Sequence, residues 1–108
     1  MRKERYCIFS PKLYMSPHLR MPGRIRWRLR HGKGAPSVWL LASFEGEETQ
    51  LELINGFFLK WKYYEDHPLR IYAMVTTFEE AEDYLVEISN QACQVGMEGR
   101  LREYLVRV

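Results

Sequence analysis

The sequence predicts an α+β fold: an antiparallel, twisted, meander-rich sheet of five to seven strands, packed on one main α-helix at about residues 77–95. Two observations lead to this class. Short apolar segments with two-residue alternation are separated by glycine- and proline-containing turns, as in a sheet of hairpins. One longer amphipathic segment follows residue 77. With 108 residues, of which 46% are hydrophobic, we expect a single domain over residues 1–108.

The clearest strand pattern lies at residues 24–30, where an arginine alternates with a large apolar residue at every step. This is the period of a half-buried strand, so we expect Trp27 and its two apolar neighbours in the core. The guanidinium groups would form one row on the opposite face and repel one another unless an anion lies against them. The row consists of Arg24, Arg26, Arg28 and Arg30.

Weaker patterns give the other strands of the first half. Residues 5–9 read as a first strand, and the three prolines of residues 10–23 predict an irregular surface segment. Residues 31–36 are a glycine-rich loop. Residues 37–44 are nearly all apolar, which predicts a central strand buried on both faces. A turn at residues 45–47 then leads into a strand at 49–53.

The next segment predicts a hairpin. With residues 54–56 as a three-residue loop, Gly56 takes the left-handed position of a bulge, and Leu51 faces Leu59. A two-residue Asn-Gly loop would mix polar and apolar residues on each face, so the pattern favours the longer loop.

A strand at residues 69–75 precedes the helix. Thr77 and Glu80 form a capping box that opens it, and Gly96 ends it. Residues 101–108 fit both a helix and a strand, and we favour the strand.

Charge is distributed unevenly along the chain. Residues 1–44 hold ten Lys or Arg and one acid, whereas residues 45–108 hold six and thirteen. Such asymmetry marks an anion-binding half, or two halves that attract each other when folded. No apolar run approaches the roughly 20 residues of a membrane span. Cys7 and Cys93 do not suggest a disulfide framework, so we expect a cytoplasmic protein without a membrane partner.

Function is predicted from the sheet face turned away from the helix, where basic and aromatic residues interleave. Cations follow phosphates and rings stack on unpaired bases, so this face suits single-stranded nucleic acid or another anionic partner. The alternative is a protein-interaction module (an adaptor, an inhibitor, a subunit or a homodimer) with a basic face and an acidic helix. The candidate nucleic-acid-binding residues are Arg24, Arg26, Arg28, Arg30, Lys33, Trp39, Lys60, Lys62, Tyr64, Arg70 and Tyr72.

No enzyme, cofactor or metal site is expected. The three histidines lack metal-ligand spacing with one another or with cysteine, and nothing in the sequence points to a base for Cys7. The paired acids after Thr77 are explained by a capped, solvated helix start.

Overall fold

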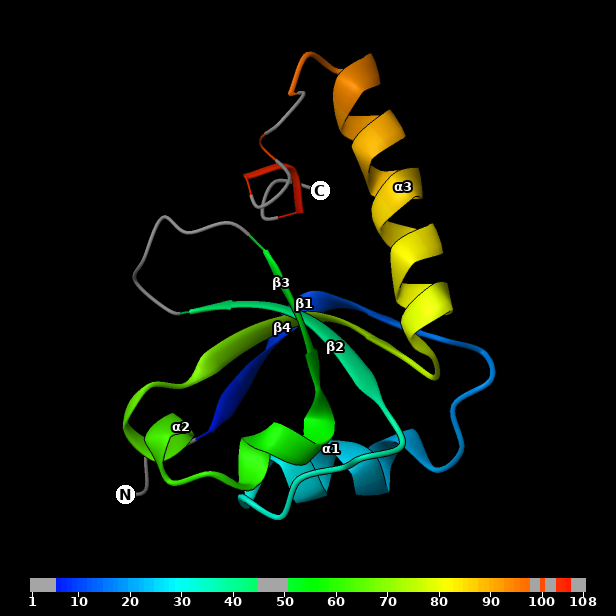
Figure 1. Cartoon of the computed structure of the whole chain (residues 1–108). Coiled ribbons are helices and arrows are strands. Elements are labelled where there is room, and N and C mark those ends of the chain that lie inside the picture. Colours follow the sequence, from blue (N-terminus) through cyan, green and yellow to red (C-terminus); the bar gives the residue numbers. More distant parts are fainter. Residues whose placement is uncertain (1–5, 45–50, 98–99, 101–102, 106–108) are drawn as a thin grey trace.

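A four-stranded mixed sheet forms the centre of the molecule (Figure 1). The structure is a computed structural model that describes residues 6–44, 51–97, 100 and 103–105. Strand β1 is parallel to β4, and β2 lies antiparallel to both of its neighbours, β4 and β3. The order across the sheet is β1-β4-β2-β3, with the bounds β1 Cys7–Met15, β2 Trp39–Phe44, β3 Glu52–Asn55 and β4 Leu69–Val75.

The predicted α+β class, with a sheet and one main helix, is therefore confirmed. The predicted sheet of five to seven antiparallel strands is wrong, because β1 is parallel to β4 and residues 24–30 and 57–60 are helical. The predicted strand at 69–75 is β4, and that at 5–9 is the start of a longer β1. The predicted turn at 45–47 and the start of the strand at 49–53 lie outside the described residues.

The two inner strands are buried on both faces. Along β2, Leu40 and Ala42 enter one apolar core and Leu41 enters another on the opposite side of the sheet. In β4, every residue except Arg70 is buried. The prediction of a central strand buried on both faces is thus correct for β2, although the strand begins at Trp39 and not at residue 37, and both faces need a cover.

Helix α3 (Phe78–Gln94) covers one face (Figure 1). It begins as predicted, since the Thr77 hydroxyl accepts a hydrogen bond from the Glu80 amide at 3.0 Å. Ile88 packs against the sheet together with Leu105. Residues 103–105 are helical, so the predicted strand is wrong there, while 101–102 and 106–108 lie outside the described residues.

Helix α1 (Pro22–Arg30) lies on the other side of the sheet, where a strand was predicted (Figure 1). Pro22 stands in the first turn, a position that needs no amide hydrogen. Ile25 and Leu29, four residues apart, are buried in the core beneath the sheet. Trp27 is 49% exposed, so the prediction that it is buried is wrong.

The predicted hairpin is replaced by the short helices η1 (Gly56–Lys60) and α2 (Tyr63–Asp66), which complete the layer of α1. The Asn55 side chain accepts a hydrogen bond from the Phe57 amide at 2.8 Å and so caps η1. Gly56 does not have the expected positive φ. A Cβ there would collide with the Ala35 carbonyl, so glycine is required for close packing. Leu59 is fully buried in the core that contains Leu29, instead of facing Leu51.

A hydrogen-bond network ties the end of β1 to the start of α3. The Ser16 hydroxyl donates to the Glu80 carboxylate at 2.5 Å, and the amide and hydroxyl of Thr76 donate to its other oxygen at 2.9 and 2.8 Å. Burial raises the pKa of Glu80, but these hydrogen bonds and the nearby His18 outweigh it and hold the pKa below its ordinary value. The ionised carboxylate therefore stabilises this junction.

The helical register of α1 predicts opposite outcomes for two neighbouring apolar residues. Leu29→Ala removes a fully buried side chain and should lower the free energy of unfolding by about 2–5 kcal/mol. Trp27→Ala removes a ring that is about half exposed and lies outside the core, and should cost clearly less, about 1 kcal/mol. Urea unfolding of both variants measures the difference. Equal losses would mean that Trp27 belongs to the core and that residues 24–30 are not this helix.

The Glu80 network predicts a pH dependence of stability. The pKa of Glu80 is lower in the folded protein than in the unfolded chain, where it is about 4.3. The network therefore stabilises the fold fully at pH values above this unfolded pKa. This stabilisation is lost as the pH falls through the lowered folded pKa. Unfolding free energies measured across this range should show the loss in the wild type and in Glu79→Gln, an exposed neighbour, but not in Glu80→Gln. Parallel curves for all three proteins would contradict the role of the network.

Candidate nucleic-acid interface

The arginines of α1 do not form one row. A helix turns by about 100° per residue, so residues four apart share a flank. Arg24 and Arg28 therefore lie on one flank of α1, and Arg26 and Arg30 lie on the other. The buried pair of apolar residues lies between them, and Trp27 points to the opposite, solvent side. The predicted continuous arginine face is wrong, because it assumed the period of a strand.

Arg28 fastens the loop that follows α1. Its Nε donates to the Gly34 carbonyl at 2.9 Å and its Nη2 to the Lys33 carbonyl at 3.2 Å. Gly34 has a φ of +69°, and a Cβ there would lie 3.0 Å from the Phe57 carbonyl oxygen. The next residue, Ala35, donates its amide to the Gly56 carbonyl at 3.0 Å. The loop is thus held between α1 and η1, and Arg28 serves this structure.

An exposed group of rings and lysines begins where this loop meets η1. The short helices bury Gly56, Leu59 and Tyr64, and the residues between these anchors stay exposed. The exposed fractions of Trp61 and Tyr63 are 51% and 54%. We name this set the aromatic–basic surface; it consists of Lys33, Phe57, Phe58, Lys60, Trp61, Lys62 and Tyr63.

The rings of this surface support one another. Phe58 meets Phe57 edge to face at 5.7 Å and Trp61 at 5.0 Å between ring centroids. The Lys60 ammonium lies 4.2 Å from the centroid of the Phe57 ring. Phe57, Phe58 and Trp61 therefore keep defined relative orientations while still presenting area to solvent.

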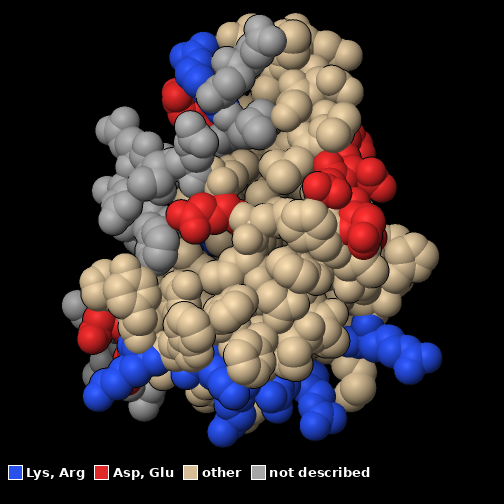
Figure 2. Space-filling view, viewed as in Figure 1, with Lys and Arg blue, Asp and Glu red and all other residues tan. Residues whose placement is uncertain are grey.

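Charge is unevenly distributed over the face seen in Figure 2. Lys and Arg side chains gather along the lower edge, where α1 and η1 lie, and a group of Asp and Glu side chains lies on the right, along α3, with further acidic side chains in the middle and at the lower left. Among the described residues, no carboxylate forms an ion pair with a lysine of the aromatic–basic surface or with an arginine of α1. Within the described part of the chain, the positive charge on this side is thus not neutralised by ion pairs.

The structure separates the predicted site residues. Lys33, Lys60 and Lys62 lie on the aromatic–basic surface, as described above. Tyr64 and Tyr72 are buried on opposite sides of the sheet, and burial raises the pKa of Tyr64. These two tyrosines cannot stack on bases, so their assignment to the site is wrong.

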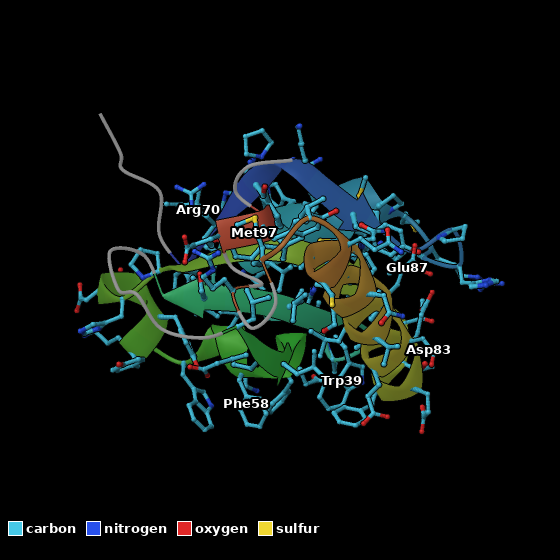
Figure 3. All side chains as sticks on the ribbon, turned by 90° about the horizontal axis from the view of Figure 1, so that it is seen from above. Trp39, Phe58, Arg70, Asp83, Glu87 and Met97 are labelled. Carbon is cyan, nitrogen blue, oxygen red and sulfur yellow. The ribbon has the colours of Figure 1, made fainter. Side chains whose placement is uncertain are left out.

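Of the two remaining predicted residues, Trp39 lies on the same side as Phe58 but packs on α3, and Arg70 lies on the opposite side. Half-buried Trp39 packs edge to face on Phe78 of α3, with the ring centroids 5.3 Å apart. Figure 3 shows Trp39 and Phe58 on one side of the molecule and Arg70 on the opposite side. The predicted single open face is therefore wrong, because both faces of the sheet are covered.

Sequence reasoning missed Phe57, Trp61 and Tyr63 as site residues. The strand reading placed them on the core side of the hairpin, opposite the lysines. The available signal was Asn55, which is a good N-cap and stands two residues before Phe57. Read as a helix start, this segment presents rings and lysines on the same surface.

The second flank of α1 lies over β1. The guanidinium carbons of Arg26 and Arg30 lie 4.8 and 5.0 Å from the centroid of the Phe9 ring. The Nε of Arg26 is buried and has no hydrogen-bond partner. An unsatisfied buried donor costs about 1–3 kcal/mol, so this flank carries a polar group that the described residues do not satisfy.

The described part of the chain offers neither a metal site nor a membrane span. No group of three or more His, Cys, Asp or Glu residues there is arranged to hold a metal ion. No helix there is both long and apolar enough to cross a membrane.

Comparison with family models, curated proteins and solved structures gave no match for this chain. A functional assignment therefore rests on the surfaces themselves.

The loop between α1 and η1 predicts different outcomes for two glycines. Gly34→Ala introduces a Cβ at positive φ against the Phe57 carbonyl and should destabilise the protein by about 1 kcal/mol or more. Gly23→Ala, inside α1, meets no atom within 4 Å and should be neutral or stabilising by up to about 1 kcal/mol. Thermal unfolding of both variants checks this. A stable Gly34→Ala protein would mean that the loop is not held as described.

Proposed function

We propose that this protein binds single-stranded nucleic acid through the aromatic–basic surface and catalyses no reaction. The observation that carries the proposal is the succession of exposed rings and lysines along η1 and α2, where no described carboxylate pairs with these lysines. Rings stack on unpaired bases whatever their sequence, and lysines follow the phosphates between them. The bases of a single strand would thus meet the rings, and its phosphates would meet the lysines.

The arrangement of the rings favours a single strand over a duplex. Bases in a duplex are stacked on one another and offer no free face to an aromatic side chain. Phe58 and Trp61 are in mutual contact, yet 37% and 51% of their surface is exposed. Neighbouring exposed rings of this kind suit neighbouring splayed bases, so we propose that unpaired RNA or DNA is the ligand.

A protein partner is the second candidate, and the same surface supports it. Exposed aromatic residues in a cluster commonly mark protein interfaces, and tryptophan and tyrosine dominate binding energy there. In a homodimer, the acidic side of α3 in one copy would complement the charge of the aromatic–basic surface in the other. A different protein partner would need an acidic patch of its own to do so. Cys7 and Cys93 form no disulfide, which fits a reducing compartment, so we propose the cytoplasm as the location in either case.

Salt dependence tests the lysines. In an anisotropy titration with a labelled single-stranded oligonucleotide, log affinity should fall linearly with log salt. The slope should be about 2 for three lysine–phosphate contacts, at about 0.7 each. Lys60→Glu with Lys62→Glu should abolish binding at moderate salt, because both side chains are exposed and the fold does not need them. Binding that ignores the double reversal would rule the surface out.

Trp61→Ala tests stacking and separates the two candidate functions. On the nucleic-acid proposal it should weaken strand binding by about 1–3 kcal/mol. The matched control is Trp27→Ala, which removes an equally exposed tryptophan that stacks on His31 outside the surface. Strand binding unchanged by Trp61→Ala would favour the protein interface. Equal binding of anionic lipid vesicles would show that the surface recognises phosphate density and not bases.

A further inference from the structure

We infer that Arg26 and Arg30, backed by the Phe9 ring, form a phosphate-binding site on the flank of α1 away from the aromatic–basic surface. Both guanidinium groups lie against the same ring, at 4.8 and 5.0 Å from its centroid. The two side chains come from adjacent turns of α1, and Phe9 comes from β1. The three residues thus converge from two elements that pack against each other.

The arrangement is costly for the protein alone. Like charges four residues apart destabilise a helix, and no carboxylate among the described residues neutralises either arginine. The Nε of Arg26 is buried without an acceptor. Cation–π contact with Phe9 orients the guanidinium groups but accepts none of their hydrogen bonds. An oxyanion would supply the missing negative charge and would accept hydrogen bonds from the terminal nitrogens of the two guanidinium groups, since the buried Nε itself is closed to solvent.

Phosphate is the anion that fits best. Guanidinium groups bind phosphate through paired, parallel N–H donors, and ring contact restricts the planes of both groups in advance. Two arginines match the charge of a phosphate monoester, which is close to −2, better than the single charge of a backbone diester. The ligand class is therefore a terminal phosphate group.

Phe9 lies where such a group can approach. β1 is an edge strand, and its pairing with β4 shifts register directly after Phe9. Arg30 is exposed and Arg26 half-buried, so one guanidinium group meets solvent and the other is embedded beside it. A phosphate would enter from the side of Arg30 and settle against Arg26.

The assignment of this phosphate to the end of a bound strand rests on the proposed function, whereas the phosphate site itself does not. A strand that lies on the aromatic–basic surface would pass the C-terminal end of α1, from Lys33 to Arg30, without crossing Trp27, and its terminal phosphate would reach the second flank. The protein would then prefer strands that carry a terminal phosphate over the same strands with a free hydroxyl.

The first experiment uses inorganic phosphate and needs no nucleic acid. Arginine Nε–Hε resonances of the full chain are followed by NMR while phosphate replaces chloride at constant ionic strength. The Arg26 and Arg30 signals should shift and saturate, and the Arg24 signal should not. Arg26→Lys keeps the charge but removes the fork, and should abolish saturation at Arg30; Arg24→Lys is the matched control. Lack of saturation, or wild-type behaviour of Arg26→Lys, overturns the site.

The second experiment compares one oligonucleotide with a 5′-phosphate, a 3′-phosphate or hydroxyls at both ends. One phosphorylated form should bind about tenfold more tightly, and Arg26→Lys should remove this preference while leaving the hydroxyl form bound. Lys60→Glu with Lys62→Glu should weaken all three strands yet keep the inorganic phosphate shifts. Equal binding of the three strands by the wild type overturns the terminal assignment. If the wild-type protein binds strands only weakly but shows the phosphate-induced shifts, the proposed function is overturned and the phosphate site is not.

Discussion

The need to bury two inner strands on both faces determines how this chain folds. β2 and β4 carry apolar side chains on both faces of the sheet, and α3, the one long helix described, covers only one of these faces. The other face would be left in water unless the segments before β2 and between β3 and β4 covered it. α1, η1 and α2 do so, and each contributes few buried side chains, such as Leu29, Leu59 and Tyr64. Their remaining residues are forced outward, which is why rings and cations share this surface.

The parts of the fold that were predictable are those whose signals are local and of one kind. The capping box at Thr77, with apolar residues at helical spacing after it, defines α3, and the continuous apolar runs define β2 and β4. Residues 24–30 were misread because Ile25 and Leu29 satisfy both periods. Their spacing of four fits a helix as well as a strand, and Trp27 decides between the two. A strand would bury Trp27, whereas the helix exposes it, and Pro22 was the local sign of a helix start.

The candidate site was predictable in composition but not in position. A basic and aromatic surface exists, and Lys33, Lys60 and Lys62 belong to it. Its rings were assigned from sheet alternation, which fails when the sheet has no open face. Tyr64 and Tyr72 followed that alternation into the two cores. What decides exposure here is which layer each segment joins, and that depends on contacts between residues far apart in sequence.

The parallel pairing of β1 with β4 has a consequence for how the chain reaches this structure. Cys7 pairs with Leu69, so the first strand has no sheet partner until nearly two thirds of the chain has been synthesised. A growing chain would hold an unpaired strand edge during that time, while β2 and β3 can already pair locally. Closing this long loop costs chain entropy before any contact repays it, which slows folding relative to a hairpin sheet of equal size. Phe9 lies in this strand and pairs with Ile71, so the surface that carries Phe9 and its arginines is complete only once β4 has paired with β1.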